Sequence, residues 1–211
     1  AKIKSGDSFL DIGSGTGAIS LCLAARLQEY APRITGLELQ PELVELSNRS
    51  AEANGFARVN FRHCNIKELP ADIPFCSFDH VISNPPYAEE DMPSPNPGKA
   101  LAHNHQDFTL KEWIKFAIKM LKPRGRFYMI NRAAALADIL AVLHGIAGEI
   151  CIIPLFSKTG QTEAKRVIVT ARKDSRAGTT LLRGITVHNP DGTHTPEAFR
   201  ILREGQGFFD R

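Results

Sequence analysis

The stretch "SFLDIGSGTGAISLCLAAR", residues 8–26, joins a short apolar run to three closely spaced glycines and then to a helical pattern. Glycine adopts the left-handed backbone that a tight turn needs, and it lets the backbone approach a ligand closely. The stretch therefore predicts a strand at residues 8–13, a glycine-rich turn, and a helix at residues 18–30. This order is typical of the first unit of an open α/β sheet that binds a ligand at the turn.

The rest of the chain repeats this alternation of strands and helices with short connections. Such a pattern predicts a mostly parallel sheet that is covered on both faces. The expected fold is α/β, a Rossmann-like, doubly wound sheet of seven strands with an antiparallel C-terminal strand. After the first strand, the other six are expected at residues 33–39, 57–64, 78–84, 125–131, 149–156 and 164–172. We expect residues 1–172 to form one domain and residues 173–211 to form a surface tail packed on it.

Composition narrows the class of protein. The chain has 211 residues, of which 43% are hydrophobic, and this suits one domain with a sizeable core. The net charge is +3, with an acidic first half and a basic region after residue 157, so a polyanionic partner is one option. The four cysteines form no C-x-x-C pair, which predicts reduced core thiols and no zinc site. No long apolar run is present, and we expect a cytoplasmic protein without a membrane partner.

Two acidic residues lie beside the glycine turn. Asp11 ends the first strand, where its carboxylate can attract a cationic amino-acid ligand directly or through water. Glu38 ends the second strand, where its two oxygens can accept both hydroxyls of a ribose. A cofactor with a ribose, an ammonium group and a sulfonium fits this pair better than a pyrophosphate does. The nicotinamide fingerprint can still be matched to Gly13, Gly15 and Ala18, so spacing alone leaves that alternative open.

This arrangement resembles the cofactor site of the class I S-adenosylmethionine-dependent methyltransferases. Their D-x-G-x-G-x-G turn matches Asp11, Gly13, Gly15 and Gly17 in this sequence. Where that family usually has an acid for the adenine amine, this chain has Asn65, whose amide oxygen can still accept the bond. The resemblance implies S-adenosylmethionine as the cofactor, with no metal. It implies that the cofactor-binding residues are Asp11, Gly13, Ser14, Gly15, Gly17, Glu38, Leu39, Asn65 and Ile66.

The fourth expected strand ends in a stiff corner, "NPPY", at residues 84–87. Each proline fixes its own φ and biases the residue before it toward extended backbone, so Asn84 and Pro85 are held nearly rigid. This rigidity aims two acceptors, the side-chain oxygen of Asn84 and the carbonyl of Pro85. Two acceptors at a fixed separation suit a planar –NH2 group, and the ring of Tyr87 offers a face for stacking. We expect the catalytic residues to be Asn84, Pro85, Pro86 and Tyr87.

The corner and the glycine turn together resemble the amino-methyltransferases. Those enzymes modify adenine N6, guanine N2, cytosine N4 or a protein glutamine amide, and the corner does not choose among them. A glutamine-amide methyltransferase acting on a translation factor, a non-catalytic nucleotide- or RNA-binding module and, less favoured, a dehydrogenase remain alternatives. Residues 88–106 form a long loop that is a candidate substrate lid, with Lys99, His103 and His105 as surface residues in it.

The C-terminal region narrows the family further. Residues 154–178 and 187–205 resemble the C-terminal pattern of the bacterial tRNA(Val) adenine-N6 methyltransferases. That resemblance implies an N6-adenine methyltransferase acting on RNA, with tRNA as substrate. Enzymes of that family carry sequence ahead of the first strand that helps to close the cofactor site, and the sequence given begins close to its first strand. Phosphate contacts would come from Lys158, Lys165, Arg166, Arg172, Lys173 and Arg176.

Overall fold

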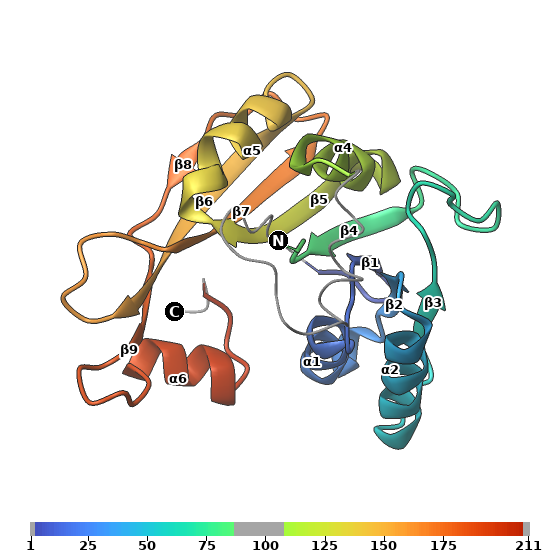
Figure 1. Ribbon diagram of the computed structural model, residues 1–211, viewed down its shortest axis with the longest axis horizontal. Helices are drawn as coiled ribbons and strands as arrows, with labels where there is room; N and C mark the ends of the chain where they lie inside the picture. The colour runs from blue at the N-terminus through green and yellow to red at the C-terminus, as the bar shows by residue number, and fades with distance from the viewer. Residues whose placement is uncertain (1–2, 87–107, 209–211) are drawn as a thin grey trace, which may run out of the picture.

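A computed structural model describes residues 3–86 and 108–208. Within these residues nine strands form one sheet in the order β3-β2-β1-β4-β5-β7-β6-β8, with β9 also paired to β6 (Figure 1). The strands are β1 (Ser8–Ile12), β2 (Arg33–Glu38), β3 (Val59–His63), β4 (Phe78–Ser83), β5 (Leu121–Arg132), β6 (Ala147–Lys158), β7 (Arg166–Lys173), β8 (Thr180–Leu181) and β9 (Ile185–His188). The helices are α1 (Ala18–Arg26), α2 (Pro41–Ala53), α4 (Leu110–Met120), α5 (Leu136–Leu143) and α6 (Pro196–Arg203), with 3-10 turns η1 (Gln28–Tyr30) and η3 (Ala133–Ala135).

The sheet separates two apolar layers, because successive side chains of a strand point to opposite faces. On β1, Phe9 packs with the residues of α1, whereas Leu10 and Ile12 pack with those of α4 and α5. Figure 1 shows α1 and α2 over one face and α4 and α5 over the other. This is the doubly wound α/β arrangement that the sequence predicts.

Helix α4 shows how the sequence sets one of these layers. Thr109 caps its first turn, where the hydroxyl accepts a hydrogen bond from the backbone N–H of Glu112 and the Glu112 carboxylate accepts one in return. The apolar residues that follow at helical spacing turn one side of α4 onto the sheet. Its buried residues are Trp113, Ile114, Phe116, Ala117, Ile118 and Met120.

The structure has more strands than the seven expected from the sequence. The region expected to be a surface tail contains β8, β9 and α6, and both strands pair in parallel with β6. The antiparallel C-terminal strand is β7, which lies between β5 and β6 and runs against both of them. The four cysteines are free, but Cys22 and Cys76 are exposed, so the prediction that all are core thiols is wrong.

The order of the strands places the site. Strands β1 and β4 are parallel neighbours, and their last residues, Ile12 and Ser83, lie at the same level. The chain reaches β2 and β3 on one side of β1, and β5 on the far side of β4. The order in which the chain adds strands therefore reverses between β1 and β4. Ligands of open α/β sheets bind at such a reversal, beyond the carboxyl ends of the strands. The glycine turn and the corner at Asn84 both leave the sheet there.

No helix in the described part of the chain is long and apolar enough to cross a bilayer.

Candidate active site

The glycine turn is strained for any residue except glycine. Gly13, Gly15 and Gly17 have φ values of 71°, 55° and 78°, in the left-handed region. A Cβ at Gly17 would lie 2.6 Å from the ring of Phe61, so that glycine also lets the turn pack on β3. A Cβ at Gly15 would meet nothing within 4 Å. The absence of a side chain at Gly15 therefore leaves space above the turn rather than satisfying a packing contact.

Glu38 is buried at the end of β2 and ties the turn to the next loop. One of its carboxylate oxygens accepts the backbone N–H of Gly15 at 2.8 Å, and the other accepts that of Gln40 at 3.0 Å. A carboxylate offers about four acceptor positions, so both oxygens retain capacity for a second donor. Glu38 also lines the cleft described below, where such donors could approach. Its expected role toward a ribose is compatible with this geometry and stays a prediction.

Asp11 is an incompletely satisfied carboxyl group below the turn. Only 2% of its surface is exposed, and its Oδ2 accepts the hydroxyl of Ser20 at 2.8 Å. Its Oδ1 has no hydrogen-bond partner among the described residues, and neither has the buried hydroxyl of Ser14. Burial raises the pKa of Asp11 to about 6, because removal from water disfavours the charged form. A cationic ligand or a bridging water would satisfy the carboxylate.

Hydrogen bonds through Ser83 hold the corner after β4 to α4 and to the end of β1. The indole N–H of Trp113 donates to Ser83 Oγ at 2.8 Å, and the Ser83 hydroxyl donates to the carbonyl of Ile12 at 2.9 Å. Pro85 is buried, whereas Asn84 and Pro86 are exposed. The corner is therefore tied to the end of β1 while Asn84 remains accessible. Tyr87, Lys99, His103 and His105 lie outside the described residues.

A cleft of about 180 Å³ joins the turn to the corner. It contains residues from both expected groups, which the sequence places 71 positions apart at Gly13 and Asn84. Six of the expected site residues in the described part of the chain do not line it, although Gly15 is hydrogen-bonded to Glu38 at its wall. They are Asp11, Ser14, Gly15, Gly17, Asn65 and Pro85. The lining residues are Gly13, Leu37, Glu38, Leu39, Gln40, Cys64, Ile66, Asn84, Pro86 and Trp113.

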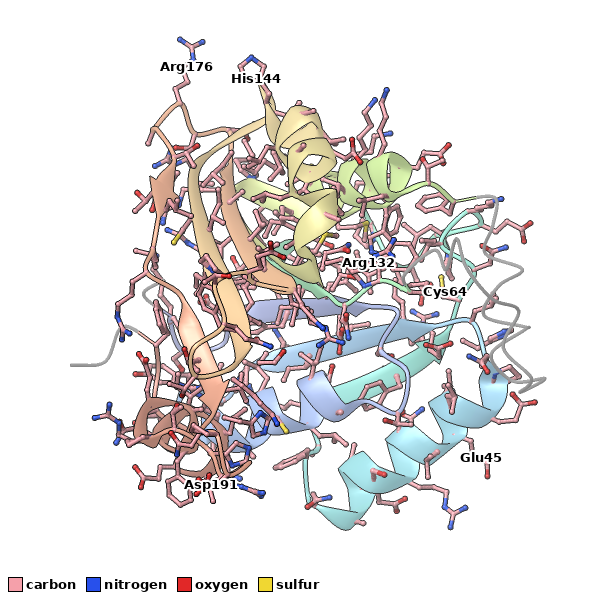
Figure 2. The ribbon with its side chains drawn as sticks, turned by 60° about the vertical axis from the view of Figure 1, so that its left-hand side comes forward. Glu45, Cys64, Arg132, His144, Arg176 and Asp191 are labelled. Atoms are coloured by element: carbon pink, nitrogen blue, oxygen red, sulfur yellow. The ribbon has the colours of Figure 1, made fainter. Side chains whose placement is uncertain are left out.

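Asn65 occupies the loop that follows β3. Its side-chain oxygen accepts the backbone N–H of Lys67 at 3.1 Å, and its own carbonyl accepts that of Glu68 at 2.8 Å. The side-chain oxygen therefore closes a local turn, and only its second lone pair is left for an adenine amine. Its neighbours Cys64 and Ile66 line the cleft instead (Cys64 is labelled in Figure 2).

Sequence reasoning placed Trp113 only in the helical core and missed its part in the site. Its ring lies against the glycine turn, since a Cβ at Gly13 would be 3.2 Å from it. Its N–H bond to Ser83 fixes the ring at the cleft wall. A signal was present, because a buried tryptophan usually finds a partner for its indole N–H and the strand end is close to α4.

The residues present fit S-adenosylmethionine. The open space at Gly15 admits a ligand close to the backbone, and the unpartnered Asp11 oxygen suits a cationic group nearby. No group of three or more His, Cys, Asp or Glu side chains in residues 3–86 and 108–208 could hold a metal. The fold and the turn together define a class I S-adenosylmethionine-dependent methyltransferase.

The chain belongs to the methyltransferase domain family, whose model matches residues 3–167. A tRNA1(Val) (adenine(37)-N6)-methyltransferase of Shewanella baltica is 26% identical over 207 residues, which cover 97% of this chain and 86% of the relative. The enzyme of the same name from Porphyromonas gingivalis is 32% identical over 133 residues, 62% of this chain and 51% of the relative. A crystal structure from Agrobacterium tumefaciens, described as a predicted O-methyltransferase, has a TM-score of 0.76 at 26% identity and covers 95% of this chain and 90% of its own.

Proposed function

We propose that this methyltransferase transfers the methyl group to N6 of an adenine in tRNA. The observation that carries the proposal is the position of Asn84 on the wall of the same cleft as Gly13 and Glu38. The names of the Shewanella and Porphyromonas relatives support the choice of adenine 37 in a valine tRNA. The alternatives named above, a glutamine amide in a protein or a non-catalytic binding module, are outcomes of the test below.

On this proposal, two oxygen atoms hold the amine by accepting its hydrogen bonds. The side-chain oxygen of Asn84 and the carbonyl of Pro85 accept the two N–H bonds of the planar amine. The nitrogen can then pyramidalise, and its lone pair, which is otherwise delocalised into the ring, becomes available for attack. S-adenosylmethionine would supply an electrophilic methyl group on a sulfonium. The attack would form an N–C bond as the bond from that methyl group to sulfur breaks, a neutral thioether would leave, and the methylated amine would release one proton to water. Positive charge develops on the amine nitrogen, where the two acceptors stabilise it, so the site needs no strong base.

Binding roles follow from the positions of the acids. We assign Glu38 to the ribose hydroxyls, through the acceptor capacity that remains beside Gly15 and Gln40. We assign Asp11 to the cationic amino-acid end, directly or through water. Asn65 stays a proposal for the adenine amine through its second lone pair. Tyr87 is proposed to stack on the substrate base, which would be turned out of its own stack to reach the cleft.

The decisive experiment is methyl transfer from labelled cofactor to deproteinised cellular RNA, followed by nucleoside mass spectrometry. We expect label in the RNA fraction, recovered as N6-methyladenosine. Label recovered as another nucleoside would contradict the choice of N6. Label only in protein would favour the glutamine amide, and a cofactor-dependent rise in melting temperature without any transfer would favour a binding module.

We predict that Asn84→Ala lowers kcat by at least about 100-fold, the usual cost of losing one preorganised polar contact to a transition state. The cofactor dissociation constant, measured by calorimetry, should stay within about twofold of the wild-type value. Asn60→Ala is the matched control, because Asn60 is an exposed asparagine on β3 that does not line the cleft. Cofactor affinity that falls in proportion to kcat would instead make Asn84 a structural residue.

A further inference from the structure

The direction of β7 divides the six basic residues that were expected to contact phosphate. In the antiparallel register, Arg166 at the start of β7 pairs with Arg132 at the end of β5. Arg172, near the end of β7, pairs with Arg126 near the other end of β5. Six residues of strand separate the two pairs, which is roughly 20 Å. The six residues therefore lie at two opposite edges of the sheet.

One of these edges is the edge that carries the active site. Strands β4 and β5 are parallel, with Ser83 level with Met129, so Arg132 lies three residues beyond that level on the side of Asn84. The backbone N–H of Ala133 donates to the carbonyl of Lys165 at 3.0 Å, which joins the β6–β7 loop to this edge. Strand β6 runs against β7, as β5 does, and therefore ends at the same edge in Lys158.

Figure 1 shows this arrangement directly. The arrowheads of β5 and β6 point the same way, and that of β7 points the opposite way. In Figure 2, Arg132 lies in the middle of the molecule and Arg176 at its upper margin. We name Lys158, Lys165 and Arg166 the near-edge cluster. Arg172, Lys173 and Arg176 belong to the far edge, and their expected phosphate contacts beside the pocket do not fit this geometry.

The two edges also differ in how their charges are used. At the far edge, Arg172 and Arg126 share the carboxylate of Glu149, at 3.2 Å and 2.6 Å. Lys173 donates to the carbonyl of Leu121 at 2.7 Å. The side chains of Arg126, Arg172 and Lys173 therefore bind groups of the protein itself, and these contacts hold β5, β6 and β7 together.

The side chains of the near-edge cluster form no ion pairs of this kind within the described residues. All three side chains are exposed. The same loop contains a single acidic residue, Glu163, which is also exposed. Arg132 adds a fourth exposed cation to this edge. The three cations of the near-edge cluster therefore outnumber the one acidic residue of their loop.

We infer that the near-edge cluster binds the phosphate backbone of the RNA whose base enters the cleft, while Arg172 and Lys173 at the far edge hold the sheet together. This inference rests on the proposed function for the identity of the polyanion. Phosphate contacts of this kind position the nucleic acid without reading its sequence. They release counterions, so RNA affinity falls as salt rises.

The test compares two charge-matched triple variants. The near-edge variant is Lys158→Gln, Lys165→Gln and Arg166→Gln. The control is Lys119→Gln, Arg124→Gln and Arg176→Gln, three exposed cations at the far edge. RNA affinity is measured at several salt concentrations with deproteinised tRNA, and melting temperatures verify that both variants fold.

We expect the near-edge variant to bind RNA at least about tenfold more weakly at low salt. The slope of log affinity against log salt should fall by about 2, at roughly 0.7 per lost contact on a single strand. The far-edge control should bind within about twofold of the wild-type protein. Equal losses in the two variants, or no loss in the near-edge variant, would overturn the inference.

Binding and transfer are scored separately, so that the two proposals can fail independently. RNA binding that depends on the near edge but is not followed by methyl transfer would retain the surface and contradict the proposed activity. Transfer to RNA that the near-edge substitutions leave unchanged would retain the activity and overturn the surface.

Discussion

Asp11 is the residue where burial and charge conflict most clearly. Its carboxyl group is almost wholly removed from water, and only Ser20 donates a hydrogen bond to it. A buried carboxylate without a cation or enough donors is unstable, and its pKa rises to about 6 as a result. In the folded protein without ligand, the protonated form stabilises the fold. That contribution is present below about pH 4 and is lost as the pH rises through 6.

The same shift predicts a pH dependence of cofactor binding. On the proposed assignment, the ionised form of Asp11 attracts the cationic end of S-adenosylmethionine, so affinity should rise as pH rises through about 6. We expect binding about tenfold weaker at pH 5 than at pH 7, with proton release on binding. Calorimetry in buffers of different ionisation heat measures both quantities.

Asp11→Asn is the control for this pH dependence. Its affinity should be nearly constant over the same pH range, because the asparagine does not titrate. A wild-type protein whose affinity is equally constant would remove Asp11 from the cofactor site.

At this scale the sequence predicted that the acids and the corner lie close together at the strand ends, and the roles assigned to them stay predictions. It identified Asp11, Glu38 and Asn84 from their positions at strand ends, and two of these three line one cleft with Gly13. It did not anticipate that Glu38 already holds the N–H groups of Gly15 and Gln40. Such bonds depend on how the loops close, and residue spacing carries no information about that.

At the scale of the element, glycines that look alike in the sequence serve different purposes. Gly36, on β2, has a Cβ position only 2.3 Å from the ring of Phe61, so it makes room for packing between strands and the turn. Gly15 has an empty Cβ position. The sequence marks both only as glycine, because their difference lies in neighbours that are distant along the chain.

This contrast predicts opposite effects of two substitutions to alanine. Gly15→Ala should cost only about 1 kcal/mol of unfolding free energy, from its positive φ, but should abolish measurable cofactor binding because the methyl group fills the open space. Gly36→Ala should cost about 1 to 3 kcal/mol through overpacking. Denaturant unfolding and calorimetry give the two quantities for each variant.

Phe61→Leu, combined with Gly36→Ala, tests the packing explanation. A smaller side chain at position 61 should recover part of the lost stability, since it removes the ring that a Cβ would meet. No recovery would place the strain elsewhere.

Cofactor binding that survives in Gly15→Ala would show that the space at Gly15 is not used.

At the scale of the whole molecule, the sequence predicted the alternating core of the sheet but not its outer edge. The central strands are apolar runs bounded by turn residues, and their pattern is visible locally. Strands β8 and β9 are short, and they exist because they pair with β6, about 30 residues earlier. Pairing of this kind is a tertiary property, and a turn-rich composition conceals it.

We propose that this outer region unfolds together with the rest of the sheet, and glycine substitutions test it. A Cβ at Gly184 would lie 2.5 Å from the carbonyl of Pro154 on β6, and its φ is +83°. Gly184→Ala should therefore strain the pairing of β9 with β6 and lower the unfolding free energy by about 2 kcal/mol in a single transition. Gly178→Ala, where a Cβ would meet nothing within 4 Å, should have little effect.

Thermal unfolding followed by two optical signals distinguishes the possibilities. Two separate transitions in the wild-type protein would mean that residues 173–208 form an independent unit. Equal destabilisation by Gly184→Ala and Gly178→Ala would mean that the contact with Pro154 does not hold β9 in place.

Trp113 gives the protein an optical reporter of its own. It is the single tryptophan of the chain, and its ring touches the glycine turn while its N–H reaches the strand that leads into the corner. Its intrinsic fluorescence therefore arises where cofactor and substrate would meet. Changes in emission wavelength and intensity would report the binding of cofactor or of substrate in real time, without any attached dye.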